Sequence, residues 1–133
     1  MNIPQELCAS DVMRRAFVTV EPEDTIGETA EKLAKADTGS ALVVEYGQLV
    51  GILTSRDVLR TVADRAHPSE ARVREWMTPH PVSVSRETPV DEAAEVMLVG
   101  GFHHLPVVEE GRPAGVIGFR TVVGSVRSGL PGW

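Results

Sequence analysis

The sequence contains one segment twice, and this duplication limits the possible folds more than any other feature. Residues 12–59 align with residues 76–123 without a gap, at a constant spacing of 64 residues. Identical residues stand at corresponding positions at Met13 and Met77, Val18 and Val82, Val20 and Val84, Glu28 and Glu92, Ala30 and Ala94, Gly47 and Gly111, Gly51 and Gly115, and Arg56 and Arg120. A repeat this short rarely buries its apolar face alone, so we expect the copies to pack on each other about a pseudo-two-fold axis. A cleft at such an axis is a candidate binding site.

The bulk composition indicates one globular domain that is not built to bind duplex nucleic acid. With 133 residues and 42% hydrophobic content, the chain can bury a core but is too short for two independent domains. The formal net charge of −6 argues against binding to duplex nucleic acid, which requires a basic face to replace the counterions of the phosphates.

The same composition predicts a cytoplasmic protein that does not cross a membrane. Cys8 is the only cysteine, so no disulfide can form within the chain. The first residues lack the basic and then apolar pattern of a secretory signal. The apolar runs are far shorter than the roughly 20 residues that a membrane-spanning helix needs.

The first repeat predicts the order strand, helix, strand, strand, helix. Residues 17–20 form the first strand, and Thr25 with Glu28 has the spacing of a capping box at the start of a helix. That helix has an apolar face at Ile26, Ala30, Leu33 and Ala34. Apolar strands at 41–44 and 49–53 flank a turn at 46–48, and a second helix covers 56–63. Nearly unbroken apolar strands imply a sheet that is covered on both faces.

The second repeat predicts the same elements. Thr88 is the expected helix cap, with Pro89 in the first turn and Asp91 three residues after the cap. The expected apolar face of this helix is Val90, Ala94, Met97 and Leu98. Strands at 105–108 and 114–117 flank a turn at 110–113, and a final helix covers 120–126. We interpret Met13, Met77 and Met97 as core residues and not as soft-metal ligands.

The predicted fold class is therefore α/β (α+β), with two β-α-β-β-α repeats. We place the first repeat at residues 8–62, a linker at 63–72, the second repeat at 73–126 and a loosely ordered tail at 127–133.

The string Gly51-Ile52-Leu53-Thr54-Ser55-Arg56-Asp57, the string His103-His104-Leu105-Pro106-Val107-Val108 and the duplication resemble the cystathionine-beta-synthase (CBS) domain family. In this family two motifs pair into a Bateman module. The resemblance covers about residues 8–126. It implies a regulatory module that binds an adenosine-containing ligand, and it implies a homodimer that acts on a regulated target protein.

Thr54 and Asp57 lie where a predicted strand runs into a helix, a place where backbone amides and the helix dipole attract anions. The resemblance implies that Thr54 contacts phosphate and that Asp57 accepts hydrogen bonds from both ribose hydroxyls. Gly51, without a side chain, would let a flat base approach the strand. A structural alternative is that Thr54 and Asp57 form a capping box for the helix, and the two roles are compatible.

The second repeat carries Gly118 in place of Thr54 and Thr121 in place of Asp57. A hydroxyl lacks the charge and the paired acceptor oxygens of a carboxylate. We therefore expect one competent nucleoside site and one degenerate site.

The resemblance also implies that the second repeat completes the competent site. Pro81, Val82 and Pro106 would bracket the base, and His103, His104 and Arg120 would face the phosphates. On the alternative interpretation one histidine packs at a strand end, the other is exposed to solvent, and Arg120 pairs with a surface acid. Adjacent histidines on a strand point to opposite sides, so joint metal ligation is disfavoured and we expect no metal site.

The chain contains no sequence motif for a catalytic nucleophile or a phosphate-binding loop, so we expect no enzymatic activity. The leading hypothesis is a regulatory module that requires no cofactor and binds AMP, ADP, ATP or S-adenosylmethionine. The alternative is a dimeric scaffold that acts without a ligand. The sequence leaves open which adenosyl ligand binds and which protein is regulated.

Overall fold

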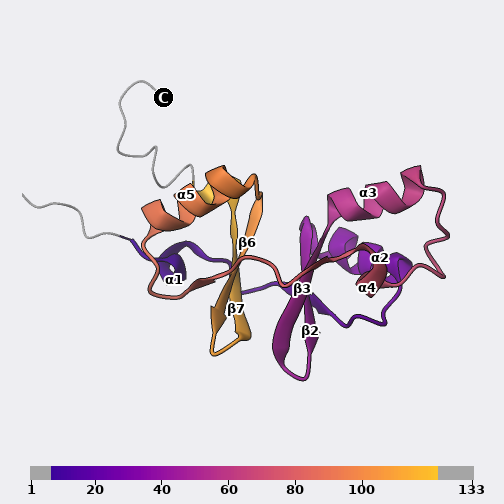
Figure 1. Cartoon of the computed structure of the whole chain (residues 1–133), viewed down its shortest axis with the longest axis horizontal. Helices are drawn as coiled ribbons and strands as arrows, with labels where there is room; N and C mark the ends of the chain where they lie inside the picture. Colours follow the sequence, from indigo (N-terminus) through magenta and orange to yellow (C-terminus); the bar gives the residue numbers. More distant parts are fainter. Residues whose placement is uncertain (1–6, 123–133) are drawn as a thin grey trace, which may run out of the picture. The chain divides into compact units, whose positions relative to one another are not determined.

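The computed structural model describes residues 7–122, and this part of the chain forms two compact units (Figure 1). The first-repeat unit contains residues 16–81 together with the hairpin residues 111–113. The second-repeat unit contains residues 7–15, 82–110 and 114–122 of the described chain. Each unit is described by itself, and the expected pseudo-two-fold axis between the repeats stays a prediction.

The first-repeat unit is a four-stranded sheet with three helices. Its elements are β1 (Val18–Val20), α2 (Ile26–Ala36), β2 (Ser40–Glu45), β3 (Gln48–Thr54), α3 (Ser55–Ala63), α4 (Val73–Trp76) and β4 (Thr78–Pro79). The strand order is β1-β2-β3-β4. Strand β1 is parallel to β2, whereas β3 is antiparallel to both β2 and β4.

The second-repeat unit has the corresponding elements. They are α1 (Ala9–Val12), β5 (Val84–Ser85), α5 (Val90–Gly100), β6 (His104–Glu109) and β7 (Arg112–Gly118), followed by helical residues 119–122. The strand order is β5-β6-β7, with β5 parallel to β6. The predicted β-α-β-β-α order is thereby confirmed; the end of the last predicted helix and the predicted tail at 127–133 lie outside the described residues. Within residues 7–122, no helix combines the length and the apolar character needed to cross a bilayer.

Both hairpins turn on a residue pair with positive φ. Tyr46 and Gly47 have φ values of 52° and 78°, and Glu110 and Gly111 have 52° and 80°. Two-residue turns of this kind match the twist of antiparallel strands, and glycine adopts positive φ without steric cost. The predicted turn at 110–113 was too long, because Arg112 and Pro113 already belong to β7.

Helix α2 begins with the predicted capping box. The Thr25 hydroxyl accepts a hydrogen bond from the Glu28 amide at 3.0 Å, and the Glu28 carboxylate accepts one from the Thr25 amide at 2.9 Å. The hydrogen bonds from the Thr25 backbone and hydroxyl lower the pKa of Glu28. Two further amides at this helix end, of Ile26 and Gly27, donate to carbonyls of the segment that follows α3.

Those carbonyls belong to Ala71 and Pro68, at distances of 2.9 and 3.0 Å from the α2 amides. The first amides of a helix have no acceptor within the helix, so this segment supplies the missing carbonyl acceptors. Ala71 is also buried in the core of the first-repeat unit. The predicted linker is therefore packed against the unit it follows.

Helix α5 does not begin as predicted. Its cap is Pro89, whose carbonyl accepts the Ala93 amide at 3.0 Å, and no side chain caps the helix. The Thr88 hydroxyl instead accepts the Ser85 amide at 3.1 Å and closes the preceding turn. Pro89 corresponds to Thr25 in the repeat, so α5 begins at the same repeat position as α2. Asp91 lies in the first turn but is not part of a capping box with Thr88.

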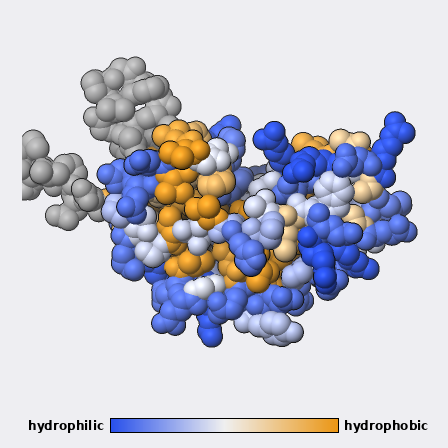
Figure 2. Space-filling view, in the orientation of Figure 1, coloured by the Kyte–Doolittle hydropathy of each residue, from blue (hydrophilic) through white to orange (hydrophobic). Residues whose placement is uncertain are grey.

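Each helix buries a narrower face than its sequence indicates. The buried residues of α2 are Ile26, Thr29 and Leu33, and those of α5 are Val90, Ala93 and Met97. The predicted face included Ala34 and Leu98, which are exposed; Leu98 is 67% exposed. Figure 2 shows hydrophobic surface over α5, where Leu98 and Val99 are exposed.

A methionine from outside each hairpin packs on a glycine within it. A methyl group at Gly51 would lie 2.5 Å from the sulfur of Met77, and one at Gly115 would lie 2.6 Å from the sulfur of Met13. Strand β4, directly after Met77, pairs with β3 at Gly51 and Ile52. The first segment of each repeat therefore belongs to the sheet and core of the unit built around the other repeat, and Met13 and Met97 are confirmed as core residues.

Because strand β7 contains two glycines with different surroundings, it offers a matched test of this packing. In Gly115→Ala the new methyl group would also lie 2.9 Å from the Arg14 carbonyl oxygen, which cannot move like the end of a side chain. We expect a loss of about 1–3 kcal/mol in the free energy of unfolding, measured by urea titration. Gly118→Ala meets no atom closer than 4.0 Å and should be nearly neutral. Equal stability of the two variants would contradict this packing.

Candidate functional site

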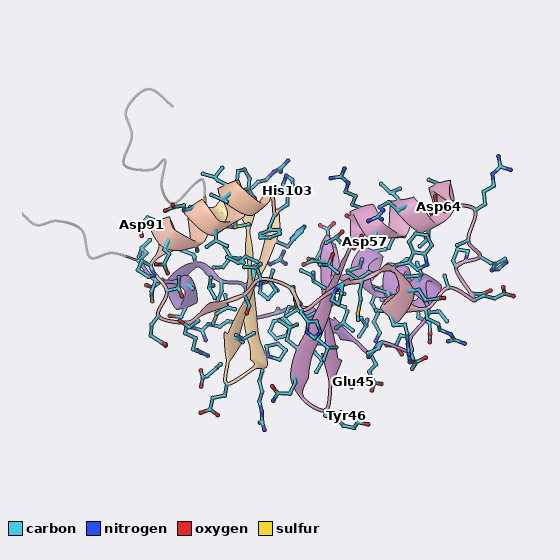
Figure 3. The ribbon with its side chains drawn as sticks, viewed as in Figure 1. Glu45, Tyr46, Asp57, Asp64, Asp91 and His103 are labelled. Carbon is cyan, nitrogen blue, oxygen red and sulfur yellow. The ribbon has the colours of Figure 1, made fainter. Side chains whose placement is uncertain are left out.

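The junction between β3 and α3 holds Thr54 and Asp57 in one hydrogen-bonded unit. Thr54 is the cap of α3. Asp57, which Figure 3 labels, lies in the first turn of this helix. The Asp57 amide donates to the Thr54 hydroxyl oxygen at 3.4 Å, and the Thr54 amide donates to Asp57 Oδ2 at 2.8 Å. The Thr54 hydroxyl donates to the same Oδ2 at 3.1 Å. The predicted capping box is therefore confirmed.

The other oxygen of Asp57 contacts a residue that the sequence analysis missed. Arg60 Nη1 lies 3.4 Å from Asp57 Oδ1. Asp57 is only 6% exposed, whereas the Arg60 side chain is 66% exposed. The sequence could have indicated this pair, because Asp57 and Arg60 are three residues apart on a predicted helix and such residues are neighbours on the helix surface.

The first-repeat unit also contains Gly51 and Pro81. Gly51 pairs with Pro79 in the ladder between β3 and β4, and Pro81 follows this ladder as a half-buried residue. Met77 fills the space on the side-chain face of Gly51, and this packing is a structural reason for glycine at that position. Approach of a base to Gly51 stays a prediction.

In the second-repeat unit, His103 contacts Phe119, the first of the helical residues 119–122. Its carbonyl accepts the Phe119 amide at 2.9 Å, and its ring meets the ring of Phe119 edge-on with a centroid distance of 5.7 Å. Arg120 follows Phe119 and is exposed. His103 and Arg120 thus flank one strand-to-helix junction. Pro106 is buried in β6, and Val82 is exposed just before β5.

His104 differs from His103 in its surroundings. It is half-buried as the first residue of β6, whereas His103 is exposed. Burial, and to a smaller extent the neighbouring His103, lower the pKa of His104 below its usual 6.5. These surroundings therefore favour the neutral form of His104. In the described part of the chain, no three His, Cys, Asp or Glu side chains are grouped as metal ligands would be.

The structure thus places the candidate residues in two groups, one in each unit. Gly51, Thr54, Asp57 and Pro81 belong to the first-repeat unit. Val82, His103, His104, Pro106 and Arg120 belong to the second. Their joining into one composite site stays a prediction. Gly118 ends β7 where Thr54 ends β3, and the second-repeat junction has no carboxylate at the position of Asp57.

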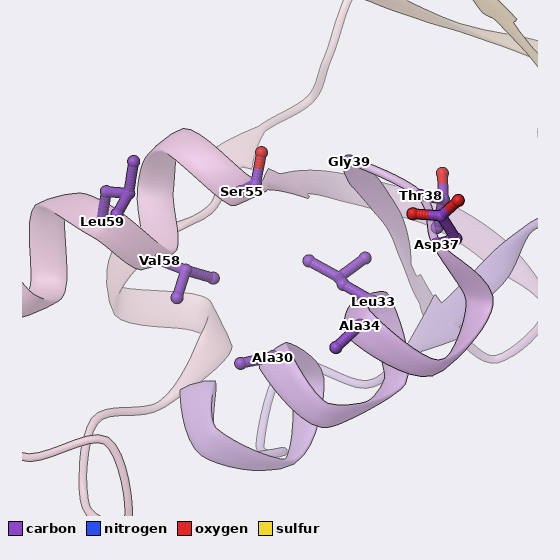
Figure 4. A pocket seen from close by; sticks show the side chains of 9 residues that line it. All are labelled: Ala30, Leu33, Ala34, Asp37, Thr38, Gly39, Ser55, Val58 and Leu59. Atoms are coloured by element: carbon purple, nitrogen blue, oxygen red, sulfur yellow. The ribbon is translucent and has the colours of Figure 1, made fainter.

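An open groove of about 510 Å³ lies between α2 and α3 (Figure 4). Its lining residues are Ala30, Leu33, Ala34, Asp37, Thr38, Gly39, Ser55, Val58 and Leu59. None of the predicted ligand-binding residues lines it. The lining has no cationic side chain and one carboxylate, so the groove is unsuited to a polyphosphate and fits an apolar group instead.

A model of the CBS domain matches residues 9–64 and residues 73–128 of the chain. The chain belongs to the CBS-domain family. The two matches correspond to the two repeats, so the protein contains two CBS domains in tandem.

Curated relatives share this domain over lengths that differ widely. The CBS domain-containing protein CBSCBSPB1 of Arabidopsis thaliana is 40% identical over 92 residues, which are 68% of this chain and 17% of that protein. The CBS domain-containing protein YhcV of Bacillus subtilis (strain 168) is 32% identical over 108 residues, which are 80% of this chain and 76% of that protein. The chain therefore spans only a small part of the plant relative but most of YhcV.

Solved structures share the fold of two β-α-β-β-α repeats. The CBS domain protein PAE2072 from Pyrobaculum aerophilum, solved in complex with AMP, has a TM-score of 0.81 and 29% identity. The similarity covers 86% of this chain and 89% of that chain. The cytosolic domain of the Mg²⁺ channel MgtE, solved in complex with ATP, has a TM-score of 0.76 and 33% identity over 89% of this chain and 48% of that chain.

The lowered pKa of His104 makes stability depend on pH. The unfolded chain takes up a proton near pH 6.5, at which the folded protein does not, so the free energy of unfolding should fall as pH decreases through 6.5. The decrease should level off below the folded-state pKa. His104→Gln should show a smaller decrease between about pH 7.5 and 5, measured by urea unfolding. If the free energy of unfolding of this variant fell with pH as steeply as that of the wild type, the pH dependence would not come from His104.

Proposed function

We propose that this CBS pair is a regulatory module that binds an adenosine-containing ligand and has no catalytic activity of its own. The candidate ligands are AMP, ADP, ATP and S-adenosylmethionine, and no cofactor is required. The observation that carries the proposal is the buried carboxylate of Asp57 at the N-terminal end of α3, hydrogen-bonded to Thr54 at the cap.

The chemistry of this junction suits a nucleotide. A carboxylate accepts hydrogen bonds from vicinal hydroxyls and strengthens them through its charge. The hydroxyl of Thr54 and the positive end of the α3 dipole lie beside it and favour an anionic phosphate. The AMP complex of the P. aerophilum relative and the ATP complex of the MgtE domain support a nucleotide as the ligand.

The second repeat would complete the site. His103, His104 and Arg120 would face the phosphates, while Pro81, Val82 and Pro106 would bracket the base. Arg120 supplies positive charge that an acidic protein needs locally to hold a phosphate. Since the second repeat has no carboxylate at the position of Asp57, we propose one ligand per chain. A signal requires that the ligand bind two arrangements of the module with different affinity.

Isothermal titration with AMP, ADP, ATP and S-adenosylmethionine tests the proposal. We expect one site per chain, and we expect Asp57→Ala to lose binding. A ligand at a hundredfold its Kd should also add about 2.7 kcal/mol of stability, which is visible as a rise in Tm.

The variant needs a control, because Asp57→Ala also removes part of a helix cap, which typically costs about 1 kcal/mol. Glu28→Ala is matched to it, since Glu28 has the same place in the capping box of α2. We expect Glu28→Ala to lose similar stability and to keep its affinity. Equal affinity of the wild type and Asp57→Ala would disprove the placement of the site, and absence of binding by every ligand would disprove the function.

A scaffold that dimerises without a ligand is the second candidate, and the apolar groove between α2 and α3 favours it. Leu59 lines this groove and is 68% exposed, and Val62 lies one turn later on α3 and is also exposed. We propose that a second copy of the chain covers this surface, whether or not a ligand binds. Removing such side chains from water stabilises an interface by roughly 25 cal/mol per Å² of buried apolar area.

Leu59→Glu should therefore shift the protein toward the monomer, measured as molar mass by light scattering. Tyr46→Glu introduces the same charge at the exposed tip of the first hairpin and should leave the molar mass unchanged. A monomeric wild type, or a variant Leu59→Glu that still dimerises, would contradict this interface.

A further inference from the structure

The carboxylate of Asp57 has few acceptor positions left for a ligand. An ionised carboxylate offers roughly four lone-pair positions, two on each oxygen. Both positions of Oδ2 are used, by the Thr54 amide at 2.8 Å and the Thr54 hydroxyl at 3.1 Å. One position of Oδ1 is used by Arg60 at 3.4 Å. Within residues 7–122 these three donors are the ones that contact the carboxylate, so a single position on Oδ1 remains.

A ribose diol that donates both hydroxyl hydrogens needs two positions. One of the three present donors must therefore leave Asp57. The Thr54 amide is fixed by the backbone at the cap of α3, so its departure would disrupt the start of the helix. The choice is between the hydroxyl of Thr54, which rotates freely, and the exposed side chain of Arg60.

Whether the ligand carries a phosphate group determines which of these two donors leaves the Asp57 carboxylate. When phosphate is present, the Thr54 hydroxyl can turn and donate to a phosphate oxygen, which frees one position on Oδ2. Both hydroxyls of the diol can then donate to the Asp57 carboxylate, one to each oxygen, while Arg60 keeps its contact with Oδ1. A nucleoside without phosphate offers the Thr54 hydroxyl only neutral acceptors, which are weaker than the Asp57 carboxylate, so the hydroxyl stays on Oδ2 and the diol displaces Arg60.

We propose that Arg60 is a specificity-determining residue that selects phosphorylated adenosine ligands over those without phosphate. It acts through Asp57, by occupying an acceptor position that only a ligand lacking phosphate needs. The selected class is adenine nucleotides, and adenosine is disfavoured. This inference rests on the proposed binding of adenosine ligands at Asp57.

The test uses Arg60→Met, which keeps much of the alkyl stem and removes every donor. Adenosine, 2′-deoxyadenosine and AMP are titrated calorimetrically against the wild type and the variant. Because Arg60 is mostly exposed and its ion pair with Asp57 is long, losing the pair should change little, and we expect adenosine to bind up to about fivefold more tightly to the variant. The Kd of AMP should stay within about twofold.

Two comparisons separate this role from a merely structural one. 2′-Deoxyadenosine has one ribose hydroxyl at the diol position and needs one acceptor, so its affinity should not change in Arg60→Met. Arg60→Lys restores a cationic donor and should restore the wild-type preference for AMP. Arg74→Met is the matched control, because Arg74 is an exposed arginine that pairs with Glu23 in the same unit, and it should not alter any of the three affinities.

Each contrary outcome has a distinct meaning. Unchanged adenosine affinity in Arg60→Met overturns the inference and leaves the proposed function intact. Weaker AMP binding with unchanged adenosine binding also overturns it, because Arg60 would then contact phosphate directly. A wild type that binds neither AMP nor adenosine overturns the proposed function and this inference with it.

Discussion

The packing of a methionine on a strand glycine is the contact on which each unit depends. Met77 occupies the space of the missing side chain of Gly51, and Met13 does the same at Gly115. In the first-repeat unit the contact brings β4 alongside β3, and in the second it accompanies a bridge between Arg14 and Val116. A side chain at either glycine would clash with the methionine that packs there. The glycines thus permit each hairpin to accept a segment from outside its own repeat.

The repeat register predicted most of the fold. Thr25 with Glu28 identified the start of α2, and the paired glycines 47 and 111 identified both hairpin turns. The start of α5 was predicted wrongly, because Thr88 has the residue type of a helix cap but the position of a turn residue. The register itself pointed to Pro89, which corresponds to Thr25. The exchange of segments between units could not be predicted, since it depends on contacts between residues that are far apart in the chain.

At the candidate site, the sequence identified the pair that the structure joins. Thr54 and Asp57 form a hydrogen-bonded unit because a threonine followed three residues later by an acid is both a helix cap and a family motif. Arg60 lies one helical turn beyond this motif, so the motif did not indicate its contact with Asp57. The roles of His103, His104 and Arg120 depend on how the two units are placed against each other, which neither spacing nor periodicity encodes. The same carboxylate of Asp57 serves helix α3 and the proposed ligand, so its few acceptor positions couple stability to specificity.

The exchange of segments also has a consequence for biosynthesis. Residues 9–13 leave the ribosome early, yet the sheet and core they join are made of residues 82–122. Residues 16–81 can form most of their unit as soon as they emerge, because its helices, linker and fourth strand all lie within that stretch. The segment 9–13 must wait until residues 82–122 have been made, and contacts between such distant residues form slowly. Translation order therefore separates the two units in time, even though the sequence presents them as equal copies.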